Sequence, residues 1–278
     1  MLAEASRRLR DAGIEAPQRE ARLLMAVASG LTTSDLIIRG HQPVPASLAD
    51  TFHAIVARRA AREPFQHIAR TASFFGLDLV SDRRALVPRA DSEVVVEAAL
   101  ALLPEGRDAR VVDLGTGSGC LLAALLATRT ELTGIGLDAS SDAADLAREN
   151  VERLGLGNRA RILTGSWTEW TGWADVDLVI SNPPYINAAT IASLDPEVRL
   201  HDPLDALDGG EDGLAAYREI VMLARAGLRA GVPIVFEIGF DQRSSVSGLM
   251  ADAGFIGLGS SRDLAGNDRV VWAFQAES

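Results

Sequence analysis

Short apolar segments alternate with helical segments through most of the chain after Arg107, and this alternation limits the fold more than any other feature. Alternation of this kind is typical of a mostly parallel sheet that helices cover on both faces. We therefore predict an α/β domain in the later two thirds of the chain. The pattern predicts strands at 110–114, 132–137, 160–164, 176–181, 232–238 and 270–274, and helices at 120–128, 142–154 and 213–228.

The first 90 residues have a different pattern. Residues 1–68 carry apolar side chains at helical spacing, which predicts a small helical domain. This domain has either a purely structural role or the more specific role of holding a substrate. Residues 69–90 contain two short strand-like segments around Gly76, which we interpret as a β-hairpin linker. We therefore divide the chain into 1–68, 69–90 and 91–278.

A glycine-rich turn joins the first strand of the α/β region to the helix that follows. Glycine permits positive φ and lets the backbone approach a ligand, and open α/β folds bind ligands at this edge of the sheet. Asp138 ends the second strand, where its carboxylate can accept hydrogen bonds from both hydroxyls of a ribose. The notable residues of the turn are Asp113, Gly115, Thr116, Gly117 and Gly119.

The turn and Asp138 do not separate NAD from S-adenosylmethionine, because a glycine loop followed by an acidic residue is also the dinucleotide signature. A tight turn without a ligand is the structural alternative. Asp113 either caps the turn, or orients the loop or holds an ammonium group. Cys120 opens an apolar helix with no base evident beside it, so we expect a small buried residue rather than a nucleophile.

The fourth strand runs directly into Asn182-Pro183-Pro184-Tyr185. Two prolines stiffen the backbone and remove two amide donors, which leaves carbonyl groups free to accept. An NH₂ group can donate one proton to the side-chain oxygen of Asn182 and the other to the carbonyl of Pro183, while Tyr185 stacks on its plane. The structural alternative is an ordinary turn that ends a strand. The functional interpretation is that the segment holds a planar nitrogen for transfer of a methyl group.

Composition narrows the classes of partner. The net charge of −11 argues against bare nucleic acid, whose partners usually carry a basic surface. A single cysteine and four histidines without metal-ligand spacing predict no internal disulfide and no metal. With no membrane-length apolar stretch and no signal sequence at the N-terminus, we expect a cytoplasmic monomer without a membrane or nucleic-acid partner.

Several further segments carry a resemblance to a known family. Together with the glycine turn, Asp138, Asn150 and Asn-Pro-Pro-Tyr, all in family order, they resemble the release-factor glutamine methyltransferases (PrmC/HemK family) nearly end to end. Asn-Pro-Pro-Tyr is shared with DNA adenine methyltransferases, whereas the segments 86–93 and 207–214 are more specific. The further segments are 62–68, 74–77, 86–93, 207–214 and 237–242.

The resemblance implies both a fold and a reaction. The fold is that of a class I S-adenosylmethionine-dependent methyltransferase, which has a Rossmann-like, mostly parallel seven-stranded sheet. A small N-terminal helical domain that docks the substrate and a β-hairpin linker precede it. The reaction is methylation of the side-chain amide of the glutamine in the Gly-Gly-Gln motif of peptide chain release factors 1 and 2.

The resemblance also implies roles for individual residues. Those that bind S-adenosylmethionine are Asp113, Gly115, Thr116, Gly117, Gly119, Asp138, Ser166, Trp167 and Asn182. Those that hold the glutamine are Asn182, Pro183, Pro184, Tyr185, Arg89 and Glu93, of which Asn182, Pro183 and Tyr185 are catalytic. A salt-linked helix start is the alternative for Arg89 and Glu93, and Glu237 is expected to be structural. Two positions depart from the family: Ala90 replaces a second proline, and Ser166 replaces an aspartate near the adenine.

Two other functions stay open at this stage. An adenine-amino methyltransferase acting on DNA or RNA would need base flipping and a positive groove. The acidic chain shows no basic run of that kind. A release-factor or cofactor-binding module without catalytic activity is the second alternative, against which the intact Asn-Pro-Pro-Tyr segment argues.

Overall fold

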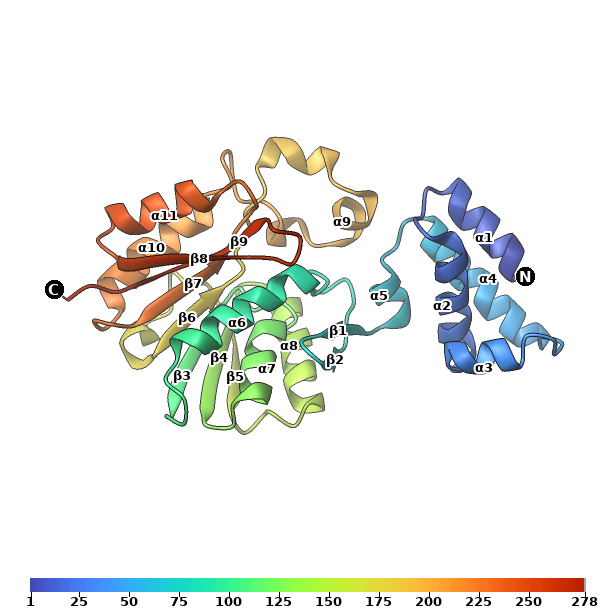
Figure 1. Cartoon of the computed structure of the whole chain (residues 1–278), viewed down its shortest axis with the longest axis horizontal. Coiled ribbons are helices and arrows are strands. Elements are labelled where there is room, and N and C mark those ends of the chain that lie inside the picture. The colour runs from blue at the N-terminus through green and yellow to red at the C-terminus, as the bar shows by residue number, and fades with distance from the viewer. Residues whose placement is uncertain (278) are drawn as a thin grey trace. The chain divides into compact units, whose positions relative to one another are not determined.

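The seven-stranded sheet of the α/β region dominates the fold of this computed structural model, which describes residues 1–277 (Figure 1). The described chain divides into two compact units. The first comprises Met1–Thr71 together with Leu194–His201, and the second comprises the remaining residues. The first unit therefore includes a short segment from the later part of the chain, in addition to the helical region expected over 1–68.

The first unit is built from short helices around a small apolar core. Leu9, Leu24 and Phe52 are fully buried in it. Ion pairs hold the segment Leu194–His201 to the rest of the unit. The carboxylate of Glu197 pairs with the guanidinium groups of Arg59 at 2.9 Å and Arg62 at 2.6 Å. The helices are α1 (Leu2–Asp11), α2 (Pro17–Ser29), α3 (Thr33–Ile38), α4 (Ala46–Ala60), α5 (Phe65–Ala69) and α9 (Pro196–His201).

The second unit begins with the expected hairpin. Strands β1 (Ala72–Phe74) and β2 (Leu77–Leu79) pair antiparallel. The turn between them places Gly76 at a φ of +77°. The carboxylate of Glu93 accepts a hydrogen bond from the amide of Phe75 at 2.7 Å, which ties the hairpin to the helix that follows.

The sheet has the strand order β5-β4-β3-β6-β7-β9-β8. Strands β3 to β7 run parallel, and the two last strands are antiparallel. The seven strands and their mostly parallel arrangement confirm the predicted fold class. The strands are β3 (Ala109–Leu114), β4 (Leu132–Asp138), β5 (Ala160–Thr164), β6 (Leu178–Ser181), β7 (Pro233–Glu237), β8 (Ile256–Arg262) and β9 (Asp268–Phe274).

Helices cover both faces of this sheet (Figure 1). One face packs against α6 (Glu93–Leu102), α7 (Cys120–Thr128) and α8 (Ser141–Arg153). The other packs against α10 (Ala215–Gly227) and α11 (Arg243–Asp252). No described helix has the length and apolar character needed to cross a membrane.

The edge strand β8 is the main element of the sheet that the sequence pattern did not predict. Its sequence, Ile-Gly-Leu-Gly-Ser-Ser-Arg, lacks the continuous apolar run expected of a buried strand. The strand pairs only with β9, and register shifts interrupt that pairing. Because it lies at the edge and is largely exposed, burial imposes no apolar pattern on it.

The strand order also explains where a site can form. The chain leaves β3 toward β4 and β5, and later returns to place β6 on the other side of β3. Ligands bind at such a switch point, outside the carboxyl ends of the strands. A ligand site is therefore expected at the ends of β3, β4 and β6.

Candidate active site

A cavity of about 480 Å³ opens where β3, β4 and β6 end. These segments are distant in sequence, and they meet because parallel strands present their carboxyl ends at one edge of the sheet. The predicted site residues that line the cavity are Arg89, Gly115, Thr116, Gly117, Asp138, Trp167, Asn182 and Pro184.

The glycine-rich turn after β3 is a rigid wall of this cavity. The amides of Gly115 and Thr116 both donate to the carbonyl of Leu137, at 2.8 and 3.0 Å. Gly115 and Gly117 have φ values of +69° and +55°. Glycine adopts such positive φ values most easily, which agrees with the positive φ that the sequence suggested for this turn.

Gly119 lies in the turn but does not line the cavity. Its φ is +79°, and a Cβ added there would approach the Cβ of Ala147 on α8 to 3.2 Å. Its absent side chain therefore serves the packing of α7 against α8 rather than contact with a ligand.

Asp113 is buried beneath the turn and does not line the cavity. Its carboxylate accepts a hydrogen bond from the hydroxyl of Thr116 at 2.7 Å. Burial raises the pKa of Asp113 to about 7, because the charged form loses its hydration. This arrangement favours the interpretation in which Asp113 orients the loop.

Asp138 reaches the cavity from the end of β4. One carboxylate oxygen accepts from the amide of Gly117 at 2.8 Å and the other from the amide of Ser140 at 2.9 Å. Burial raises its pKa, whereas the two amide donors oppose that rise. Each oxygen has a second lone pair, so the carboxylate keeps acceptor capacity for a ligand hydroxyl.

Ser166 and Trp167, both predicted to bind the cofactor, differ in their position relative to the cavity. Trp167 lines the cavity, and its indole N–H donates to Glu219. The hydroxyl of Ser166 forms a hydrogen bond with that of Thr168 at 2.8 Å, and Ser166 does not line the cavity. The ring of Trp167 therefore offers a flat apolar surface where Ser166 does not reach.

The Asn-Pro-Pro-Tyr segment leaves β6 at the cavity. Asn182 and Pro184 line it, whereas Pro183 is buried. Among residues 1–277, no side chain or amide forms a hydrogen bond with the Asn182 carboxamide. Its oxygen is thus available to accept from a ligand.

Tyr185 does not line the cavity. Its hydroxyl lies 3.4 Å from a carboxylate oxygen of Glu237, and its ring packs against the core beneath α10 and α11. Burial raises its pKa well above the usual value. The structure therefore does not bring Tyr185 to the cavity wall beside Asn182.

Arg89 and Glu93 are separated by their partners. Arg89 lines the cavity and pairs with Asp202 at 3.0 Å. Glu93 does not line the cavity, because its carboxylate is bound to the hairpin amide of Phe75. The two side chains do not form the mutual salt link considered as an alternative.

Other residues of the cavity wall were not predicted individually as site residues, although residues 86–88 belong to the family-like segment 86–93. Residues 84–88 and 140–143 contribute, as do Pro203, Asp205 and Ala206 from the loop before α10. Cys120 also lines it, and burial raises the pKa of its thiol to about 12, which disfavours the nucleophilic thiolate. Within the described residues, no group of three or more metal-ligating side chains occurs.

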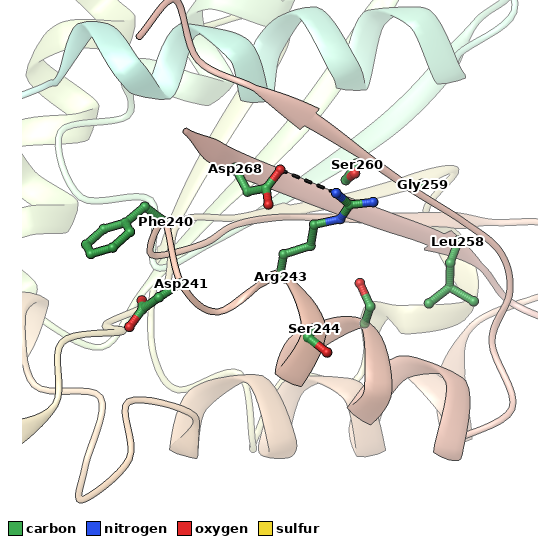
Figure 2. A pocket seen from close by; sticks show the side chains of 9 residues that line it. Phe240, Asp241, Arg243, Ser244, Leu258, Gly259, Ser260 and Asp268 are labelled. Carbon is green, nitrogen blue, oxygen red and sulfur yellow. Dashed lines mark ion pairs between the residues drawn. The ribbon is translucent and has the colours of Figure 1, made fainter. Parts of the chain in front are cut away.

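A second, wider depression lies between α11 and the strands β8 and β9 (Figure 2). Figure 2 shows Arg243 directed across it at Asp268, and the two charges lie 3.5 Å apart. None of the predicted site residues lines this depression. We therefore assign the candidate active site to the cavity at the strand ends.

Comparisons with known proteins show which families the chain resembles. Residues 1–69 match the family model described as PrmC N-terminal domain, and residues 92–194 match that described as Methyltransferase small domain. The release factor glutamine methyltransferase of Caulobacter vibrioides is 43% identical, over 96% of this chain and 92% of that protein. The enzyme of the same name from Agrobacterium fabrum is 42% identical, over 97% and 94%.

A solved structure supports the fold independently. The hMettl16 catalytic domain, in complex with the MAT2A 3'UTR hairpin 6, superimposes with a TM-score of 0.59 at 16% identity. The match covers 73% of this chain and 77% of that one. At this identity the likeness concerns the fold alone.

Proposed function

The chain belongs to the release factor glutamine methyltransferases, and we propose that it methylates the glutamine of the Gly-Gly-Gln motif in peptide chain release factors 1 and 2. As a member of that family it is an S-adenosylmethionine-dependent protein-(glutamine-N5) methyltransferase. The observation that carries the proposal is the position of Asn182. Its unengaged carboxamide lines the same cavity as the glycine turn and Asp138.

The residues of the cavity fit S-adenosylmethionine. The volume of about 480 Å³ lies within the usual range of ligand pockets, roughly 300–1,000 Å³. Gly115 and Gly117 permit close approach of a ligand to the turn, and Asp138 offers carboxylate acceptors for ribose hydroxyls. When bound, the cofactor supplies a methyl group carried on a positively charged sulfur.

The chain's own contribution is to hold the acceptor nitrogen. A glutamine amide is a poor nucleophile, because its lone pair is delocalised into the carbonyl group. In our proposal the Asn182 oxygen accepts one amide proton and the Pro183 carbonyl accepts the other. These two acceptors favour a pyramidal nitrogen whose lone pair faces the methyl group. Orientation of this kind can lower a barrier by ~7–11 kcal/mol.

Tyr185 belongs to the proposal with a modified task. The sequence suggests stacking on the substrate amide, but the ring lies against the core and its hydroxyl faces Glu237. We propose that Tyr185 acts by fixing the shape of the segment that carries Asn182 and Pro183. A role for Glu93 in the substrate pocket likewise has to act through the hairpin that it holds.

The proposal extends to the setting of the reaction. The N-terminal unit, which the PrmC N-terminal domain model spans, is our candidate for docking the release factor. We place the reaction in the cytoplasm, with the enzyme as a monomer. The net charge of −11 supports a protein substrate over nucleic acid.

Mass spectrometry of the Gly-Gly-Gln peptide tests the proposal. Purified enzyme, S-adenosylmethionine and a release factor should yield one added methyl group on that glutamine. A release factor with glutamate in place of the glutamine is the matched control and should stay unmodified. If the folded enzyme leaves the glutamine unchanged and instead methylates adenine in DNA or RNA, the proposed substrate is wrong.

A further inference from the structure

Two segments beside the site have no task in the mechanism above, although both contact Asn-Pro-Pro-Tyr. They are Leu207–Leu214 and the residues from Glu237 to Gln242. The carboxamide of Gln242 joins them. Its nitrogen donates to the carbonyl of Tyr185 at 2.9 Å and to that of Gly213 at 3.2 Å. Its oxygen accepts from the amide of Gly239 at 3.0 Å.

We propose that Gln242 is a positioning residue for methyl transfer. By bridging three stretches of backbone, it holds Asn-Pro-Pro-Tyr in the shape that presents the acceptors of Asn182 and Pro183. Gln242 does not line the cavity, so it acts through the segment rather than on the substrate. This inference rests on the proposed function, because it concerns the same acceptor site.

The tetrapeptide needs support from outside, because its prolines cannot donate hydrogen bonds. Regular pairing with a neighbouring strand stops where β6 ends at Ser181. The next backbone bonds occur beyond the prolines, where Ile186 donates to Leu207 at 3.0 Å and accepts from Gly209 at 2.8 Å. Tyr185 is the one residue between the prolines and Ile186, and Gln242 binds its carbonyl.

Two glycines make this close approach possible. A Cβ added to Gly213 would overlap the carbonyl oxygen of Tyr185 and lie 2.7 Å from the Gln242 nitrogen. A Cβ on Gly209 would lie 2.8 Å from the Cα of Tyr185 and 2.9 Å from the carbonyl oxygen of Pro184. Because these are mostly backbone atoms, neither position accepts a larger residue without moving the segment.

Glu237 supports the same residue from its other end. The strand β7 ends at Glu237, whose carboxylate meets the hydroxyl of Tyr185 at 3.4 Å. The hydroxyl of Tyr217 donates to the backbone carbonyl of Glu237 at 2.7 Å. One short stretch of chain therefore holds Tyr185 at its hydroxyl and, through Gln242, at its carbonyl.

Gln275 provides a matched control for a purely structural role. It is a buried glutamine, whereas Gln242 is partly buried, and its side-chain amide likewise donates to a backbone carbonyl, that of Arg225, at 3.0 Å. It follows β9 beside the start of β7, at the opposite edge of the sheet from the cavity. Gln275→Leu removes a comparable side-chain bond without touching Asn-Pro-Pro-Tyr.

The experiment compares Gln242→Leu with Gln275→Leu. We expect Gln242→Leu to lower kcat by about tenfold to a hundredfold, as misplacement of a reacting group does. The Kd for S-adenosylmethionine, measured by calorimetry, should stay within about twofold, because the glycine turn keeps its own hydrogen bonds. Gln275→Leu should lower Tm and leave kcat within about twofold of the wild type.

A pH profile of Gln242→Glu adds a readout that a general loss of stability would not produce. A neutral carboxyl can donate one hydrogen bond to the Tyr185 carbonyl, whereas a carboxylate can only accept. A carboxylate facing the carbonyl oxygens of Tyr185 and Gly213 should have a pKa above the usual value of about 4.3, so the kcat of Gln242→Glu relative to wild type should rise as pH falls from about 8 to about 5.5. A flat ratio would argue against the hydrogen bond as the cause.

Two outcomes would overturn the inference. One is a kcat for Gln242→Leu within about twofold of wild type. The other is a loss of kcat that follows Tm in the same proportion as in Gln275→Leu. If wild-type enzyme does not methylate the release factor, the proposed function fails instead. Hydrogen exchange at the amides of Ile186 and Ala188 then still tests the inference, since Gln242→Leu must accelerate it.

Discussion

The two halves of the proposed active site are held in place in different ways. The cofactor half is supported locally: the glycine turn after β3 bonds to Leu137 at the end of the adjacent β4, and Gly117 bonds to Asp138. The acceptor half is supported at long range. Asn-Pro-Pro-Tyr relies on Gly209, Gly213 and Gln242, which come much later in the chain. The contrast predicts that mutations in the first half change cofactor binding, and mutations in the second change turnover.

Asn182→Ala should produce the largest effect and tests the acceptor half directly. Loss of one preorganised hydrogen-bonding partner at the reacting atoms typically lowers kcat by about 10²–10³-fold. The Kd for S-adenosylmethionine should change much less, which calorimetry checks. Asn158→Ala, in the exposed turn before β5, is the control and should be neutral. A large rise in the cofactor Kd with an unchanged kcat would place Asn182 in the other half.

Glu237→Gln should alter the pH dependence of stability. Burial raises the pKa of Glu237 to about 7 from a model-compound value of 4.5, so the folded protein favours the protonated form. Its stabilising contribution is present below pH 4.5 and is lost as pH rises through 7. The neutral glutamine avoids that loss.

The difference in unfolding free energy between Glu237→Gln and wild type should therefore move in favour of the variant between about pH 5 and pH 8. The change should amount to at most about 3 kcal/mol. Urea denaturation at several pH values measures it, and the titration of Asp113 cancels because both proteins contain it. A pH-independent difference would show that Glu237 keeps an ordinary pKa.

Asp138→Asn tests the cofactor half. Weakening a charged acceptor typically costs about 1.5–3 kcal/mol, so the Kd for S-adenosylmethionine should rise roughly tenfold to a hundredfold. At saturating cofactor, kcat should fall far less than in Asn182→Ala. Asp145→Asn on the exposed side of α8 is the control carboxylate. Equal losses of kcat in Asp138→Asn and Asn182→Ala would remove the distinction between the halves.

The smallest expected effect concerns stability and comes from two glycines that have the same φ. Gly119 and Gly231 both have a φ of +79°, but only Gly119 has a neighbour within 4 Å of an added Cβ. Gly231→Ala should cost about 1–2 kcal/mol from φ alone. Gly119→Ala should cost about 1 kcal/mol or more in addition, because the new methyl group presses on Ala147. Urea denaturation of both variants measures the difference, and equal losses would contradict it.

Much of the fold follows from local patterns. The predicted strand 160–164 and helix 120–128 match β5 and α7 at both ends, and the other predicted strands differ by at most two residues at either end. These elements are buried, so each must carry a continuous or periodic apolar pattern. The apolar pattern is weakest in elements that are only partly buried. The elements β8 and α11 are of this kind, and the sequence did not predict them.

The predicted site divides in the same way. Gly115, Gly117, Asp138 and Asn182 line the cavity, because each lies at or just after the end of a parallel strand, and strand ends are visible in the sequence. Tyr185 does not line it, because the direction of its side chain depends on Glu237 and on the core beneath α10. No local pattern encodes that environment.

The sequence by itself determined most of the buried strands and helices, the glycine turn and the stiff Asn-Pro-Pro-Tyr segment, since each depends on neighbouring residues. Only the tertiary structure decided how that segment is held. The pairing of β7 beside β6 brings Gln242 to the Tyr185 carbonyl, and an ion pair draws Glu197 to the N-terminal unit. Contacts of this kind arise when distant segments pack together, and packing of distant segments leaves no periodic pattern in the sequence.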